Sequence, residues 1–124
     1  MMDMAKNNVS LGKIGEDLAV QYLKDKGYEI LERNWRSCHK EIDIIAVDGN
    51  NIVFVEVKTR KDDEFGVPEM AVNRNKRAHI YAVAASYYYE HKIDLEVRFD
   101  VISILYRPGN PEITHIVDAF HSVR

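Results

Sequence analysis

The stretch Glu41–Thr59, EIDIIAVDGNNIVFVEVKT, contains two apolar segments separated by Asp48-Gly49-Asn50-Asn51. Tight hairpin turns favour Asp, Asn and Gly because these residues tolerate positive φ angles. The stretch therefore predicts a β-hairpin with strands at 41–47 and 52–59. Both faces of the first strand are apolar, with Ile42, Ile44 and Ala46 on one and Ile45 and Val47 on the other. Strands of this kind are covered on two sides, which predicts a sheet between helices.

A helix is predicted on each side of the hairpin in the sequence. The first follows Ser10, a preferred N-cap residue, and ends at Gly27, a preferred residue after a helix. Its apolar stripe is Leu11, Ile14, Leu18 and Tyr22, with Glu16 at one margin of the apolar side. The second runs from near Asn73, after a turn at Pro68, to about His91. Its core stripe is Ile80, Val83, Ala84 and Tyr87.

Three further strands, at 28–35, 95–106 and 113–117, complete the element order α-β-β-β-α-β-β. This order predicts an α/β fold in which helices flank a mixed sheet. The chain has 124 residues, which suits one domain over 11–124 preceded by a flexible N-terminus over 1–10. The single Cys38 and the lack of an apolar signal core or membrane segment favour a cytoplasmic protein.

The hairpin also carries charged residues that predict a metal site. With the turn centred on Gly49-Asn50, Asp43 stands opposite Glu56 and Glu41 stands opposite Lys58, all on one face. Two carboxylates at this distance repel each other unless a cation compensates them. A hard cation such as Mg²⁺, bound by one or two carboxylates, water and a phosphate, is the simple solution. The alternative is a structural ion pair between Glu56 and Lys58 on a wet strand face.

Three groups of basic residues point to a nucleic-acid partner. The net charge of −3 argues against a uniformly basic surface, so the basic face would be local. The groups are Arg33, Arg36, His39 and Lys40; Lys58, Arg60 and Lys61; and Arg74, Lys76 and Arg77. A salt-bridged surface is the alternative. Lys76 continues the core-facing stripe of the second helix, so we expect it either above the Asp43/Glu56 site, on a substrate phosphate, or snorkelling to water.

Together these residues resemble the PD-(D/E)XK nuclease superfamily with its restriction endonuclease-like αβββαβ core. More specifically, the chain is identified as a member of the uncharacterised bacterial YraN family, whose relatives include archaeal Holliday junction resolvases. The resemblance covers about residues 11 to 102. It rests on Gly15-Glu16, Asn34-Trp35-Arg36, Glu41-Ile42-Asp43, Phe54 to Lys58 with Arg60, Phe65-Gly66 with Pro68, Ala71-Val72 with Lys76, and Arg98 to Val101.

The resemblance implies metal-dependent hydrolysis of phosphodiester bonds in DNA, including branched DNA. It assigns Mg²⁺ or Mn²⁺ to Asp43 and Glu56, with Glu41 as a further ligand, and assigns the nucleophilic water to Lys58. Glu16 would complete the acidic cluster. The residues expected to bind nucleic acid are Arg36, Lys40, Arg60, Lys76 and Arg77. The alternative is a catalytically inactive nucleic-acid-binding module on the same fold, because nuclease folds are also reused for binding.

Two further features lie outside this motif. Ala78, Ala82, Ala85 and Tyr89 form a second apolar stripe on the second helix, which hints at a partner or a homodimer. The spacing of His115, Asp118 and His121 is that of metal ligands, but a histidine near a C-terminus is usually solvated, and we expect no metal site there.

Overall fold

The computed structural model describes residues 4–61, 74–107 and 109–120. Its elements confirm the order predicted from the sequence. They are helix α1 (Met4–Asp25), strands β1 (Glu29–Ser37), β2 (Lys40–Asp48) and β3 (Asn51–Lys61), helix α2 (Arg74–Glu90), and strands β4 (Glu96–Tyr106) and β5 (Glu112–Ile116). The start of the first helix was predicted wrongly. The helix begins at Met4, so Ser10 lies inside it and does not cap it.

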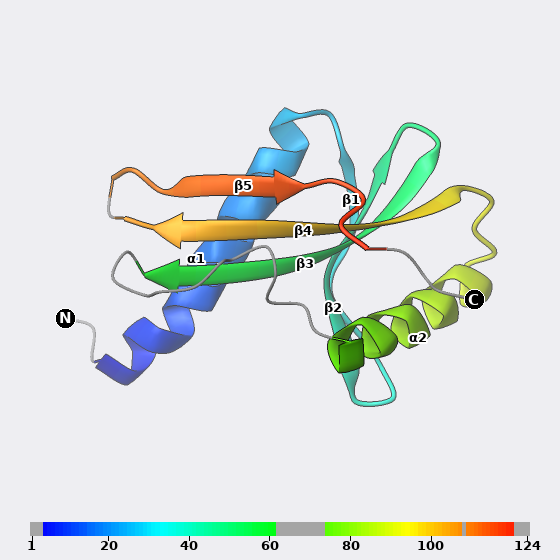
Figure 1. The fold of residues 1–124 in the computed structure, drawn as a ribbon, viewed down its shortest axis with the longest axis horizontal. Coiled ribbons are helices and arrows are strands. Elements are labelled where there is room, and N and C mark those ends of the chain that lie inside the picture. The colour runs from blue at the N-terminus through cyan, green and yellow to red at the C-terminus, as the bar shows by residue number, and fades with distance from the viewer. Residues whose placement is uncertain (1–3, 62–73, 108, 121–124) are drawn as a thin grey trace.

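The strands form one five-stranded sheet in the order β1-β2-β3-β4-β5. β3 and β4 are parallel, and the other neighbouring strands are antiparallel. A parallel pair needs a long crossover, and α2 lies within it. Figure 1 shows α1 passing behind β3 and β4, whereas α2 lies in front of β2. The architecture is the αβββαβ restriction endonuclease-like core, extended at one edge by β5.

The hairpin of β2 and β3 has the predicted register. Ile44 pairs with Val55, and Val47 pairs with Ile52. Gly49 has a φ of 59°, as a tight hairpin turn requires. The preceding turn between β1 and β2 uses Cys38 and His39 at φ angles of 52° and 66°. Neither residue type signals such a turn in the sequence.

Each face of the sheet carries its own apolar core. The core beneath α2 includes Ile45, Ile52 and Phe54, and the core beneath α1 includes Ala46 and Val53. The face predicted for one residue was wrong. Ile42 packs in the α2 core, whereas Ile44 and Ala46 pack in the α1 core. The alternation of β2 is therefore interrupted at Asp43, which lies between them.

The buried side of α1 also differs from the prediction. Leu11, Ile14, Leu18 and Tyr22 are half-buried, whereas Gly15, Ala19, Val20 and Leu23 are buried. The reason is a close approach to the sheet, because a Cβ atom at Gly15 would overlap the Thr59 side chain. The small residues Gly15 and Ala19 allow α1 to pack close to β3. The helix is therefore rotated about its axis relative to the prediction, and Glu16, next to Gly15, lies at the edge of the sheet.

The two stripes predicted on α2 are confirmed. Its core stripe is buried, and Ala78, Ala82, Ala85 and Tyr89 are exposed. The predicted turn at Pro68 and the motif residues Phe65-Gly66 and Ala71-Val72 lie outside the described residues. Of the helices that the structure describes, neither is long and apolar enough to cross a membrane.

Candidate active site

Asp43 lies at a break in both ladders of β2. On one side the pairing with β3 extends from the turn to Ile44 and Val55. On the other side, Arg33 and Trp35 of β1 pair with the residues that flank Asp43. Asp43 Oδ2 instead accepts a hydrogen bond of 2.8 Å from the backbone N–H of Val57. The carboxylate thus takes the place of a ladder bond where the strands separate.

Glu56 is the buried acid of the site, with only 6% of its residue surface exposed. Two lysines approach the same oxygen, Oε2. Lys76 Nζ from α2 lies 3.0 Å away, and Lys58 Nζ lies 4.0 Å away. A buried carboxylate is costly without a cationic partner, and α2 supplies the nearer one. Of the two placements expected for Lys76, the structure shows the ammonium on Glu56, although 43% of the side chain remains exposed to water.

The two acids interact as their predicted proximity requires. Burial, followed by the charges of Glu56 and Glu16, raises the pKa of Asp43 to about 7, although the Val57 hydrogen bond acts in the opposite direction. Burial lowers the pKa of Lys76, but the hydrogen bond to Glu56 and the charges of the surrounding acids together outweigh it, and the net shift of the pKa is upward. The acids of the site therefore repel one another when no further cation is present.

Glu16 and Glu41 meet at one residue of β1. Asn34 Nδ2 donates to Glu16 Oε2 over 2.8 Å and to Glu41 Oε2 over 3.2 Å. Arg33 bonds the other Glu16 oxygen, and Arg36 bonds the other Glu41 oxygen. The predicted opposition of Glu41 to Lys58 is wrong, because the ladder ends before these positions and β1 holds Glu41 instead. Asn34 belongs to the Asn34-Trp35-Arg36 motif, but the motif alone does not predict that it bridges these two acids.

A cavity of about 270 Å³ opens beside these acids. It is lined by His39, Lys40, Glu41, Asp43, Lys76, His79 and Ile80. Lys40 thus lines the cavity together with Lys76, and Arg60 lies two residues after Lys58 on β3. Arg36, the exposed partner of Glu41, lies on the neighbouring strand. Of the residues predicted to bind nucleic acid, Lys40 and Lys76 therefore line the cavity, whereas Arg36 and Arg60 lie on the strands β1 and β3.

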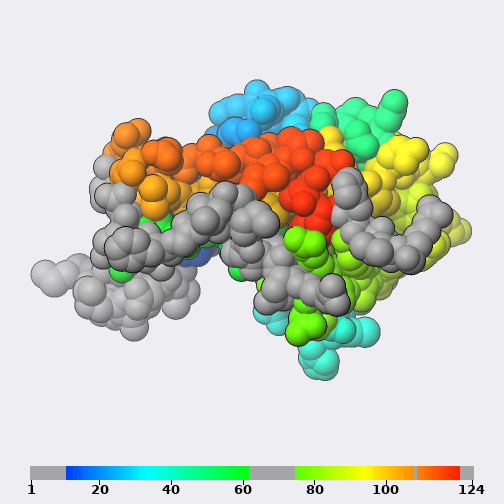
Figure 2. All heavy atoms as spheres, in the orientation of Figure 1, coloured from blue at the N-terminus to red at the C-terminus, as the bar shows by residue number. Residues whose placement is uncertain are grey.

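Arg77 is directed elsewhere. Its guanidinium lies 5.3 Å from the centroid of the Phe120 ring, beyond β5. Figure 2 shows the start of α2, in green, beside the segment that follows β5, in red. Among the described residues, no three His, Cys, Asp or Glu side chains form a preassembled metal-ligand group.

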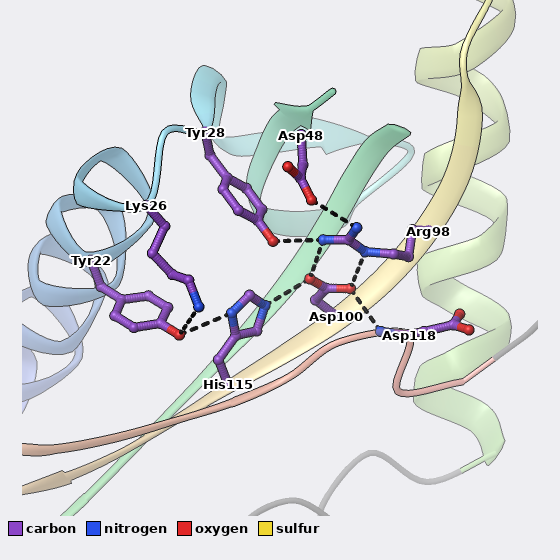
Figure 3. A network of polar contacts seen from close by, with 8 residues as sticks. All are labelled: Tyr22, Lys26, Tyr28, Asp48, Arg98, Asp100, His115 and Asp118. Atoms are coloured by element: carbon purple, nitrogen blue, oxygen red, sulfur yellow. Dashed lines mark hydrogen bonds and ion pairs between the residues drawn. The ribbon is translucent and has the colours of Figure 1, made fainter. Parts of the chain in front are cut away.

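A second polar cluster lies between α1, β4 and β5 and is shown in Figure 3. Asp100, which is fully buried, is its centre. Arg98 donates to both of its oxygens over 2.9 and 3.0 Å, and His115 Nε2 lies 2.7 Å away. The Asp118 N–H donates a further bond of 3.0 Å. Burial alone would raise the pKa of Asp100, but these bonds hold the pKa below its usual value.

The expectation that His115 is solvated was wrong. Only 3% of its side chain is exposed, and its Nδ1 atom lies 3.2 Å from the hydroxyl oxygen of Tyr22. Its position on a short edge strand gives no sequence signal of burial, because α1 covers it from far away in the chain. His121, the third residue of the spacing, lies outside the described residues.

The fold is that of a restriction endonuclease-like α/β domain. The chain belongs to Uncharacterised protein family UPF0102, whose sequence profile matches residues 15–104. This confirms the expected YraN-like family.

Relatives of the same family name match almost the whole chain. A UPF0102 protein of Geotalea daltonii is 50% identical over 117 residues, which are 92% of this chain and 91% of the relative. One from Thermodesulfovibrio yellowstonii is 49% identical over 112 residues, covering 90% and 96%. One from Bacteroides fragilis is 44% identical over 118 residues, covering 95% and 97%.

Proposed function

We propose that this chain is a nuclease that hydrolyses phosphodiester bonds in DNA with Mg²⁺ or Mn²⁺. The observation that carries the proposal is the environment of Glu56. This acid is 6% exposed, its charge raises the pKa of the neighbouring Asp43, and two lysines converge on one of its oxygens. Strongly perturbed acids beside a cavity, with cations in reach, are typical of catalytic sites.

The donor set fits a hard divalent cation. Asp43 and Glu56 offer carboxylate oxygens, and Mg²⁺ commonly binds one or two carboxylates together with water and a substrate phosphate. Such a cation supplies stabilisation for the negative charge that develops on the phosphate oxygens. Asp43 and Glu56 would hold it, and Glu16 and Glu41 would add negative charge from α1 and β2.

The lysines would act on the substrate. Lys58 is within reach of Glu56 Oε2 and is one third exposed, so its ammonium can orient the attacking water at the open side of the site. Lys76 lines the cavity and can bind a phosphate oxygen of the cut strand. Lys40, Arg36 and Arg60 would bind more distant phosphates, which positions the strand without reading its sequence.

Separating binding from cleavage tests the proposal. Wild-type protein and Lys58→Ala are incubated with Mn²⁺ and linear, flapped and four-way DNA. The wild type should cut at least one substrate. The variant should keep most of its DNA affinity, since one phosphate contact among several contributes little, but should lose metal-dependent cleavage. An exposed lysine on α1, changed as Lys24→Ala, serves as the control and should cut like the wild type.

The opposite result has a clear meaning. If the wild type binds these substrates but cuts none with Mn²⁺, the chain is the catalytically inactive nucleic-acid-binding module. If it neither binds nor cuts them, the proposal is overturned.

A further inference from the structure

Asn34 occupies an unusual backbone position in the middle of β1. Its φ is 51°, in the left-handed region that L residues rarely adopt. It lies between Arg33 and Trp35, whose partners on β2 are Ile44 and Ile42, so Asn34 faces the position of Asp43. Asn is the non-glycine residue that tolerates this conformation best. The strand thus leaves its regular path opposite the central acid of the site.

This conformation places the Asn34 amide between two acids. Its nitrogen carries two hydrogens, and it donates one bond to Glu16 on α1 and one to Glu41 on β2. Both partners are carboxylate oxygens, which only accept, so the contacts fix which side of the amide faces them. One side chain thereby joins two elements whose acids come from distant parts of the chain.

The charges of Glu16 and Glu41 affect the pKa values of different residues of the site. The Glu16 charge contributes to the raised pKa of Asp43, and the Glu41 charge contributes to the raised pKa of Lys76. Glu16 is mostly buried, with 16% of its side chain exposed, so its position depends on its partners. The Arg33 bond to Glu16 is long, at 3.3 Å, which leaves the 2.8 Å bond from Asn34 as its tighter hydrogen bond.

We propose that Asn34 is a positioning residue that holds the Glu16 carboxylate near Asp43 and thereby sets the affinity of the site for a divalent cation. The inference rests on the proposed nuclease function and assigns a role to a residue that touches neither the cation nor the substrate. Outer hydrogen-bond partners of this kind act by fixing the orientation of the groups that face a metal.

The test is calorimetric titration of folded protein with Mn²⁺, with no DNA present. Asn34→Gly suits it because glycine accepts the left-handed backbone and removes the side chain that carries the amide. We expect a loss of about tenfold in Mn²⁺ affinity, the lower end of the range for such partners. Lys92→Gly is the matched control. Lys92 is also left-handed, at a φ of 51°, and lies past the end of α2. It should bind Mn²⁺ like the wild type.

A double-mutant cycle with Glu16→Ala tests whether Asn34 affects Mn²⁺ affinity through Glu16. If Asn34 acts through Glu16, the loss caused by Asn34→Gly should largely disappear once Glu16 is absent. A purely structural role would lower the melting temperature and leave Mn²⁺ affinity unchanged. Equal affinity of Asn34→Gly and wild type, or additive losses in the cycle, would overturn the inference and leave the proposed function standing. A wild-type protein that binds no Mn²⁺ would overturn both.

Discussion

The ammonium of Lys76 lies 3.0 Å from Glu56 Oε2, although the two residues belong to different layers of the fold. Lys76 is 43% exposed at its side chain, whereas Glu56 is buried. A partly exposed cation therefore neutralises a buried acid. A divalent cation that binds Glu56 through Oε2 would compete with this lysine for that oxygen.

The first prediction follows from this competition. Lys76→Met keeps the long side chain and removes its charge. Mn²⁺ affinity, measured by calorimetric titration, should rise severalfold because the competing ammonium is gone. The free energy of unfolding without metal should fall by about 1 kcal/mol, a modest loss for a partly exposed pair. Lys24→Met on α1 should change neither quantity. Weaker Mn²⁺ binding by Lys76→Met would contradict the competition.

The second prediction concerns DNA binding by the same variant. If Lys76 binds a phosphate, Lys76→Met should lower DNA affinity, and the slope of log affinity against log salt should become shallower by about one unit. Fluorescence anisotropy between low and moderate salt measures both. Binding that is unchanged at every salt concentration would restrict Lys76 to its ion pair with Glu56.

The third prediction uses the pKa of Asp43, which is raised from 3.8 to about 7. Between these values the folded protein binds more protons than the unfolded chain, so this group's contribution to stability falls as pH rises through that window. Asp43→Asn removes the penalty and keeps an oxygen for the Val57 N–H. It should raise the free energy of unfolding at pH 8 by at least about 1 kcal/mol and have little effect at pH 3.8 or below.

Urea unfolding at the two pH values measures this difference. The same variant should lose Mn²⁺ binding, because one of the two carboxylates is gone. Unchanged Mn²⁺ affinity would end the case for Asp43 as a ligand, whatever the variant does to stability.

The fourth prediction concerns the close contact of α1 with β3. Gly15→Ala should destabilise the protein by about 1 to 3 kcal/mol, since the added Cβ overlaps Thr59 and forces the helix away. Gly12→Ala is the matched control on the same helix. No atom lies within 4 Å of a Cβ at Gly12, so it should gain about 0.5 to 1 kcal/mol from helix propensity. Thermal unfolding compares them, and equal effects would contradict the contact.

The fifth prediction separates the Asp100 cluster from the active site. The pKa of Asp100 is lowered, so its stabilising effect is present above the unfolded value of 3.8 and is lost as pH falls below it. Asp100→Asn should lower the free energy of unfolding by about 3 kcal/mol at pH 7, as for other broken buried ion pairs. The loss should become smaller as the pH falls below 3.8. Mn²⁺ affinity of the folded variant should be unchanged. Asp94→Asn, at an exposed site, is the control.

The sequence by itself determined the features that depend on neighbouring residues. The turn at Gly49 set the register of the central hairpin, because loop length and positive φ leave few alternatives. The helical period identified the buried stripe of α2 and directed Lys76 toward the sheet. The same register and period placed Asp43, Glu56 and both lysines in one region, because each step spans only a few residues or a single helix.

Only the tertiary structure decided which polar groups meet across elements. The break at Asp43 places Ile42 on the opposite face of the sheet from Ile44. The break depends on the pairing of β2 with β1 and β3, which the alternation of residues within β2 does not reveal. Likewise, Asn34 joins acids from α1 and β2, and His115 is buried by contacts from residues about ninety positions away. Local propensity fixes backbone geometry, but a hydrogen bond between distant segments exists only after the layers have packed.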